Sequence, residues 1–167
     1  WHCPRRDCVL PAIPTSRVVR HYRPEDAASS RMEQKASVAR ASGVQLTSIE
    51  RTATTIVGKL IESGIDLGHI GITGSLLLGR AGKNSDIDFV LYGREAFSAA
   101  RNWVCRGIQS GLVQPFSDAQ WEDTWRRRGC PMTVEEYKWH EQRKWNKGSV
   151  NGFRFDINLV QDRLDEP

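Results

Sequence analysis

The chain has 167 residues, of which 39% are hydrophobic and 26% charged, and its formal net charge is +4. These proportions are those of an ordinary globular protein, long enough to bury a core as one domain or as one domain with an arm. No apolar run approaches the roughly 20 residues that a membrane-spanning helix needs, which excludes such a helix.

The N-terminal region, residues 1–45, is basic and rich in proline, arginine and serine. It holds eight Lys/Arg against four Asp/Glu, so that it alone supplies a charge of +4. We interpret it as an arm or the end of a preceding domain, with the folded domain at residues 46–167. A basic arm suits RNA or DNA as a partner, although a solvated basic surface is equally compatible with this excess.

The start of the chain carries no signal peptide, which favours a cytoplasmic location. It begins at Trp1 instead of methionine, as is typical of part of a longer protein.

Four residues near the start are of the types that bind zinc. Cys3 and Cys8 lie close to His2 and His21, and thiolates and imidazoles are the usual zinc ligands. Without a second cysteine pair this is at most half of a zinc site.

A helix is predicted from Thr47 to about Gly64. The pattern T-x-x-E at Thr47 and Glu50 is a capping box. Apolar residues then follow at helical spacing, at Ile49, Ala53, Ile56, Val57, Leu60 and Ile61. This single apolar stripe predicts packing against a core and not a cofactor site.

The next stretch, 69–93, predicts two strands joined by a turn and a basic loop. Asp86 and Asp88 stand one residue apart on the second strand, so both carboxylates point to one face and Ile87 to the other. Two neighbouring carboxylates raise each other's pKa unless a cation lies between them. A divalent ion such as Mg²⁺, or Mn²⁺ in its place, removes that cost, with phosphate oxygens completing its coordination.

Phosphate-binding groups are predicted beside these carboxylates. The turn at Gly74 and Ser75 can present backbone N–H groups and a hydroxyl to phosphate. Lys83, in the loop before Asp86, can reach the tail of a nucleoside triphosphate. A phosphate-binding turn next to metal-binding carboxylates indicates phosphoryl or nucleotidyl transfer.

Three helices are predicted between residues 94 and 148, two of them opened by Ser117 with Gln120 and by Thr133 with Glu136. The last contains E-E-Y-K-W-H-E-Q-R-K-W-N-K-G, in which aromatic and cationic side chains alternate. Aromatic rings stack on bases while Lys and Arg hold phosphates, so Arg143 and Lys144 are candidates for binding an acceptor. Filling of a core by the tryptophans is the alternative interpretation.

The final strand, 153–160, alternates apolar and polar side chains. Asp156 lies on its polar face, with Phe155 and Ile157 on the other. Beside the strand of Asp86 and Asp88 it would complete a cluster of three carboxylates.

Gly74-Ser75, ten intervening residues, and Asp86-Ile87-Asp88 with apolar neighbours resemble the signature of the DNA polymerase β-type nucleotidyltransferase superfamily. The segment S-D-I-D-F-V is similar to that of the minimal nucleotidyltransferase domains of archaea and bacteria. This resemblance, over roughly residues 48–160, implies a mixed α/β (α+β) fold, a small mixed sheet with helices mainly on one face.

The resemblance also implies an activity. Gly74 and Ser75 would hold the phosphates of the triphosphate, Asp86 and Asp88 would bind two Mg²⁺ ions, and Asp156 would bind the second ion. The acceptor stays open between nucleic acid ends, a protein partner and small molecules. A non-catalytic module that binds nucleotide or RNA is the alternative of another class.

Overall fold

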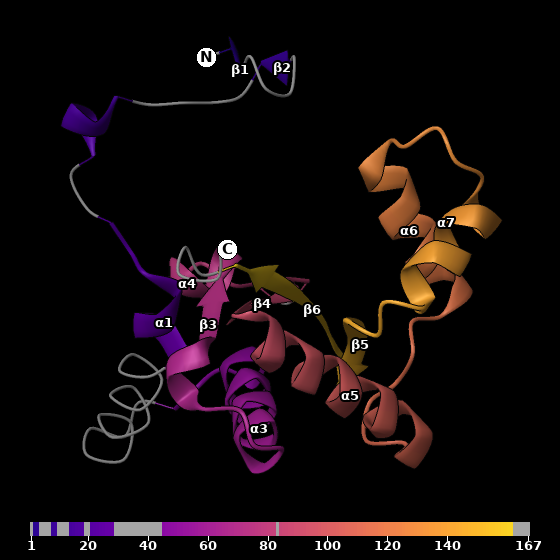
Figure 1. Cartoon of the computed structure of the whole chain (residues 1–167), viewed down its shortest axis with the longest axis horizontal. Coiled ribbons are helices and arrows are strands. Elements are labelled where there is room, and N and C mark those ends of the chain that lie inside the picture. Colours follow the sequence, from indigo (N-terminus) through magenta and orange to yellow (C-terminus); the bar gives the residue numbers. More distant parts are fainter. Residues whose placement is uncertain are drawn as a thin grey trace.

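The computed structural model describes residues 2–3, 8–9, 14–18, 21–28, 45–82 and 84–161. A four-stranded sheet forms its centre, with long helices packed against one face (Figure 1). The mixed α/β fold expected from the sequence is confirmed. In the described ranges, no helix has the length and apolarity to cross a bilayer.

The elements follow one another along the chain. They are β1 (His2–Cys3), β2 (Cys8–Val9), the 3₁₀ turn η1 (Thr15–Arg17), α1 (Pro24–Asp26), α3 (Ser48–Glu62), the 3₁₀ turn η3 (Leu67–His69), β3 (Ile70–Thr73), α4 (Gly74–Leu77), β4 (Ile87–Tyr92), α5 (Arg94–Ser110), α6 (Asp118–Arg128), α7 (Val134–Gln142), β5 (Lys147–Val150) and β6 (Phe153–Val160).

The central sheet has the order β3-β4-β6-β5. β4 and β6 run parallel, whereas β3 and β5 run antiparallel to their neighbours. The parallel pair needs a long crossover, and the segment from α5 to β5 provides it. This crossover brings residues about 70 apart in the sequence into register at the centre of the sheet.

Three helices start at the residues that the sequence predicts. Capping boxes form at Thr47 with Glu50, Ser117 with Gln120 and Thr133 with Glu136. In each, the side chain at the third helical position accepts a hydrogen bond from the backbone N–H of the cap residue, at 2.8–2.9 Å. Each box satisfies N–H groups that the helix itself leaves unpaired.

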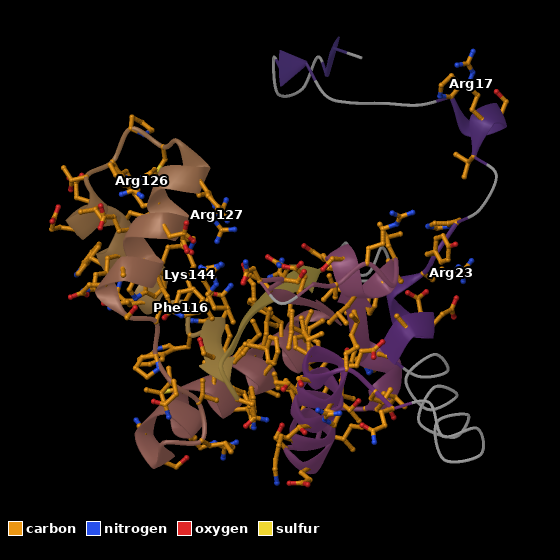
Figure 2. The ribbon with its side chains drawn as sticks, turned by 180° about the vertical axis from the view of Figure 1, so that it is seen from behind. Arg17, Arg23, Phe116, Arg126, Arg127 and Lys144 are labelled. Carbon is orange, nitrogen blue, oxygen red and sulfur yellow. The ribbon has the colours of Figure 1, made fainter. Side chains whose placement is uncertain are left out.

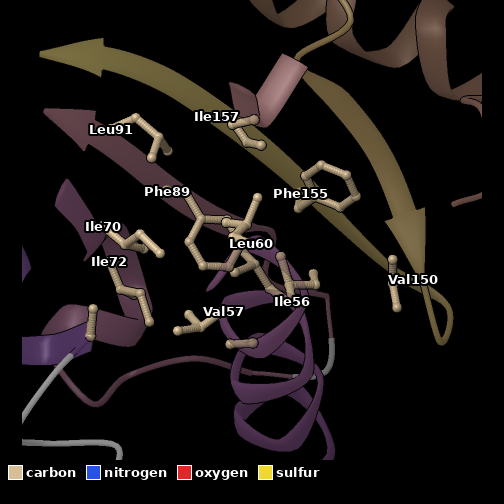
Figure 3. Packing of buried hydrophobic residues seen from close by; sticks show 14 of the residues in the cluster. Ile56, Val57, Leu60, Ile70, Ile72, Phe89, Leu91, Val150, Phe155 and Ile157 are labelled. Carbon is tan, nitrogen blue, oxygen red and sulfur yellow. The ribbon is translucent and has the colours of Figure 1, made fainter. Parts of the chain in front are cut away.

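The core lies between α3, α5 and one face of the sheet (Figure 3). Its largest fully buried side chains are Phe89, Phe155, Ile56, Leu60, Ile70, Ile72, Ile87, Leu91, Ile157, Val104 and Val113. Alternate residues of β4 and β6 supply this face, so the residues between them point to the opposite side. That opposite side carries Asp88 and Asp156.

The predicted apolar stripe of α3 is right for five of its six residues. Ile61, the last of them, is 43% exposed although the preceding Leu60 is 0% exposed, because successive helical side chains point in different directions and Ile61 lies at the solvent edge of the stripe. Residues before the expected boundary at 46 also pack on the domain: Ala27 and Ala28 belong to the core cluster, and the Tyr92 hydroxyl donates to Glu25 at 2.8 Å.

Two isoleucines of α3, one buried and one exposed, provide a test of this packing. Ile56 is 1% exposed and Ile61 is 43% exposed. Ile56→Ala is expected to lower the free energy of unfolding by about 2–5 kcal/mol, because it leaves a cavity in the core, whereas Ile61→Ala is expected to cost less than about 1 kcal/mol. Urea unfolding followed by circular dichroism measures both, and equal losses would contradict the packing described here.

Candidate functional site

Two carboxylates lie side by side at the centre of the sheet. Asp88 of β4 and Asp156 of β6 are partners in the parallel register, and both are partly exposed on the face away from the core. Asp86 directly precedes β4 and is also partly exposed. The parallel pairing therefore joins the two parts of the predicted carboxylate cluster.

The turn at Gly74 approaches Asp88 closely. Thr73, the last residue of β3, is the register partner of Asp88, so the chain turns into α4 directly beside that carboxylate. Gly74 has φ +64°, and a Cβ at this position would lie less than 3.0 Å from Asp88 Oδ2. Only glycine combines this left-handed conformation with such an approach.

Ser75 follows in α4 and is partly exposed. Lys83, predicted to bind the triphosphate, lies outside the described residues.

Burial and two neighbouring negative charges act on Asp88. Its pKa is raised, first by desolvation and then by the charges of Asp156 and Asp86, and Lys147 and Arg127 oppose this rise only in part. The ionised form of Asp88 is therefore disfavoured until a cation approaches it.

Asp86 takes part in an ion-pair network. Arg154 donates from Nε to Asp86 Oδ1 at 2.8 Å and from Nη1 to Asp123 Oδ2 at 2.8 Å. Arg127 Nη2 lies 3.2 Å from Asp123 Oδ2 and 3.6 Å from Asp86 Oδ2. Two arginines and two aspartates thus connect α6 to the carboxylate face of the sheet, and the bond to Arg154 is the largest cause of the lowered pKa of Asp123.

Asp156 is held by two residues that precede and open β5. Lys147 donates from Nζ to Asp156 Oδ2, and its side chain is only 6% exposed. Asn146 donates from Nδ2 to Asp156 Oδ1 at 3.2 Å and to the Ile157 carbonyl at 3.0 Å. Glu141 Oε2 lies 3.9 Å from Lys147 Nζ, so this buried ammonium lies between two carboxylates.

A cavity of about 250 Å³ opens over the carboxylates. Its lining residues are Asp86, Asp88, Phe116, Thr124, Arg127, Arg128, Lys147, Arg154, Phe155 and Asp156. Figure 2 shows Arg127 projecting from α6 on the side that faces the sheet. A cavity with carboxylates on its floor and arginines on its wall can hold both a cation and a phosphate chain.

The donor atoms at this site are of the type that a divalent metal prefers, but only some of them are positioned to bind one. Asp88 and Asp156 are adjacent hard oxygen donors of the type that Mg²⁺ prefers, and the raised pKa of Asp88 favours a cation. Asp86, however, is turned to Arg154. Within the described part of the chain, no three Asp, Glu, His or Cys side chains are arranged to hold a metal ion.

Arg143 and Lys144, predicted to bind an acceptor, lie outside this cavity. The Arg143 guanidinium stacks on Trp139, 3.4 Å from the ring centroid, and Lys144 donates to Glu141. Arg143 lines a second cavity, which also contains Trp145. The zinc hypothesis for Cys3 and Cys8 cannot be compared with the structure, because their side chains lie outside the part that is described.

Several residues of the site were not predicted from the sequence. Arg154 lies on the same face of its strand as Asp156, so the alternation of β6 offered a signal for it. Asn146 and Lys147 carry no such signal, since their position depends on the pairing of β5 with β6. The same holds for Asp123 and Arg127 on α6, which reach the site only through the tertiary fold.

Comparison with known proteins decides the family. Residues 57–150 match the sequence model of the nucleotidyltransferase domain. The chain belongs to the nucleotidyltransferase domain family. The matched segment contains the Gly74 turn, Asp86 and Asp88, and it ends just before β6, which carries Asp156. The resemblance to the polymerase β-type superfamily is thereby confirmed.

One relative among curated proteins is an uncharacterized protein of the archaeon Methanocaldococcus jannaschii. It is 34% identical over 105 residues, which make up 62% of this nucleotidyltransferase domain chain and 31% of the relative. The chain thus spans about a third of the relative's length. No solved structure matches this chain.

Proposed function

We propose that this nucleotidyltransferase moves a nucleoside monophosphate from a nucleoside triphosphate to an acceptor hydroxyl, in a metal-dependent reaction. One observation carries the proposal: Asp88 and Asp156 are paired in register, and the Gly74 turn lies against Asp88. A turn for phosphates beside paired carboxylates is the arrangement that nucleotidyl transfer needs.

Residues of the turn and of the cavity wall would bind the phosphates of the triphosphate. The Gly74 and Ser75 turn would bind the outer phosphates of the triphosphate, assisted by Lys83. Arg127 and Arg128 line the cavity wall and would neutralise phosphate charge. Catalysis of this type depends mainly on positioning and charge neutralisation, which fixed cationic side chains provide.

Asp88 and Asp156 would hold a divalent cation, Mg²⁺ or Mn²⁺, and Asp86 would join them after leaving Arg154. Such ions, two in our proposal, neutralise the reacting phosphate and lower the pKa of the acceptor hydroxyl. Asp156 would then receive the proton of that hydroxyl while Lys147 and Asn146 hold its carboxylate in place.

The ion pair between Arg154 and Asp86 would compete with a metal. Arg154→Gln is expected to tighten Mn²⁺ binding about two- to fivefold, the effect of removing a partly exposed pair worth about 0.5–1 kcal/mol. Asp123→Asn is expected to weaken Mn²⁺ binding, because Arg154 then pairs with Asp86 alone. Electron paramagnetic resonance of free Mn²⁺ measures both affinities, and equal values in the two variants would show that Asp86 does not bind the metal.

The favoured acceptor is a nucleic acid, because the first 45 residues are basic, α6 ends in three consecutive arginines, and the acceptor must approach a cavity walled by arginines. A protein partner and a small molecule are the other acceptors. We place this reaction in the cytoplasm, where thiols stay reduced; of the described cysteines, Cys105 and Cys130 are free.

A non-catalytic module that binds nucleotide or RNA is a second candidate. The specific observation in its favour is that the two carboxylates already form ion pairs, Asp86 with Arg154 and Asp156 with Lys147. In such a module, nucleotide would bind equally well with and without a divalent metal, and binding would survive replacement of the aspartates.

Label transfer tests the proposal and identifies the acceptor. The protein is incubated with cell extract, Mg²⁺ or Mn²⁺, and each of the four α-labelled ribonucleotides in turn. Label that is lost on ribonuclease treatment identifies RNA as the acceptor, and label lost only to protease identifies a protein. Absence of label in macromolecules and small molecules alike, with every nucleotide, would contradict nucleotidyl transfer.

A further inference from the structure

A second cavity, of about 360 Å³, lies next to the carboxylate cavity. Phe116 and Lys147 line both cavities, so the two share a wall. Figure 2 shows Phe116 at the base of the α6–α7 hairpin, on the side of the sheet. None of the residue roles proposed above accounts for this second cavity.

The walls of the second cavity are mainly aromatic and apolar. Trp121 and Trp145 line it together with Phe116, and the rings of Phe116 and Trp121 lie 5.1 Å apart, centroid to centroid. Ile108 and Pro115 complete the apolar part. Its volume is within the range of small-molecule sites, which combine apolar walls with a few polar groups.

Trp145 is held in this wall by a costly backbone conformation. Its φ is +51°, a left-handed value that is unusual for a bulky residue. Arg101 of α5 donates to the carbonyls of Arg143 and Lys144 and so fixes the turn that precedes it. Strained residues of this kind are concentrated at binding sites, and the Trp145 side chain stays 38% exposed.

Polar groups in the same wall lack partners. Asn146 uses Nδ2 for Asp156 and Ile157, which fixes the orientation of its amide and leaves Oδ1 without a hydrogen bond. The indole N–H of Trp121 also has none. Both atoms are buried in this wall, and a planar ligand edge with one donor, for Oδ1, and one acceptor, for the indole N–H, would complement them.

We propose that the second cavity binds a nucleobase, stacked against Trp145 and placed by Asn146 beside the carboxylate cavity. The inference rests on the proposed function for the identity of the base, which belongs either to the triphosphate or to the terminal nucleotide of a nucleic acid acceptor. A nucleobase offers a planar ring for stacking and an edge with donors and acceptors. Asn146 also donates a hydrogen bond to Asp156, so one residue would contact both the base and the proposed catalytic carboxylate.

Free nucleosides test the proposal, because they carry the base without the phosphates. Adenosine, guanosine, cytidine and uridine are titrated by calorimetry into the whole chain, its Trp145→Ala variant and its Ile61→Ala variant. We expect at least one nucleoside to bind, with a loss of about tenfold or more in Trp145→Ala and no loss in Ile61→Ala. Ile61 is a suitable control, since it is also a large hydrophobic residue, is 43% exposed and does not line the cavity.

Trp145→Phe keeps an aromatic ring and is expected to retain most of the binding, which separates stacking from misfolding. No binding of any nucleoside, or equal binding by Trp145→Ala and the unaltered chain, would overturn the proposal. Asp88→Asn is expected to bind nucleosides normally while losing transfer. Binding without transfer in the unaltered chain would therefore count against the proposed function alone, and transfer without binding against the nucleobase site alone.

Competition identifies the source of the base. Displacement of the bound nucleoside by an α,β-methylene triphosphate assigns the cavity to the triphosphate substrate. Displacement by a short single-stranded oligonucleotide assigns it to the acceptor. A nucleoside that neither probe displaces would overturn the assignment to a substrate nucleobase.

Discussion

Asp88→Asn is expected to abolish nucleotidyl transfer and, in the same protein, to raise the melting temperature in metal-free buffer. Transfer falls at least about a hundredfold to a thousandfold, the scale of losing one preorganised electrostatic contact to the transition state. The melting temperature rises by about 2 °C or more, because the amide is neutral where burial and the charges of Asp156 and Asp86 raise the pKa of Asp88.

The stability effect of Asp88 depends on pH in a defined direction. Since the pKa of Asp88 is raised in the folded protein, the folded chain binds the carboxyl proton more tightly than the unfolded chain does. Its contribution to stability is complete below the pKa of the unfolded chain and is lost as the pH rises through the folded pKa. The advantage of Asp88→Asn should therefore disappear in acid and be largest near neutral pH.

Asp66→Asn is the matched control for this substitution. Asp66 accepts a hydrogen bond from the Gly68 N–H at 2.7 Å through a side-chain oxygen that asparagine retains, and it does not line the carboxylate cavity. We expect normal transfer and an unchanged melting temperature in Asp66→Asn. Retention of transfer by Asp88→Asn, measured with purified protein and labelled nucleotide, would rule out its proposed role.

Gly74→Ala is the second substitution with a large expected effect. The added Cβ must displace the Asp88 carboxylate, which it would approach to less than 3.0 Å, and the backbone stays at φ +64°. We expect transfer to fall about a hundredfold or more, since small displacements of a positioned group have such effects. Stability falls by about 1–2 kcal/mol for the left-handed conformation, with a further loss from the displacement of Asp88.

Gly79→Ala separates these two causes. Gly79 has nearly the same φ, +66°, but a Cβ there meets nothing within 4 Å. We expect it to lose only the conformational part of the stability and to keep its transfer activity. If Gly74→Ala and Gly79→Ala had equal activities, the close approach of the turn to Asp88 would have no functional meaning.

Local signals predict much of this fold. The three capping boxes mark their helix starts because the hydrogen bonds involve residues only three apart. The alternation in β4 and β6 separates the buried Ile87 and Phe155 from the carboxylates for the same reason, since it depends on strand geometry alone. Ile61 departs from its predicted stripe because tertiary packing decides how wide a stripe of the helix is covered.

The electrostatics of the site depend on contacts that the sequence does not mark. Asp86 and Arg154 are 68 residues apart and meet because β4 and β6 pair. Lys147 reaches Asp156 through the β5–β6 pairing, and Asp123 comes from the α6–α7 hairpin. The carboxylates of the site could thus be predicted, whereas the cationic side chains that pair with them could not.

The most direct test of the proposed chemistry compares two labels of one nucleotide. Purified protein, an acceptor-containing extract and Mg²⁺ are supplied with the preferred triphosphate, labelled either in the α- or in the γ-phosphate. For nucleotidyl transfer we expect the acceptor to take up the α-label and the γ-label to appear in pyrophosphate. With Asp88→Asn we expect neither labelled acceptor nor labelled pyrophosphate. Uptake of the γ-label by the acceptor would show phosphoryl transfer of another kind and would contradict the account.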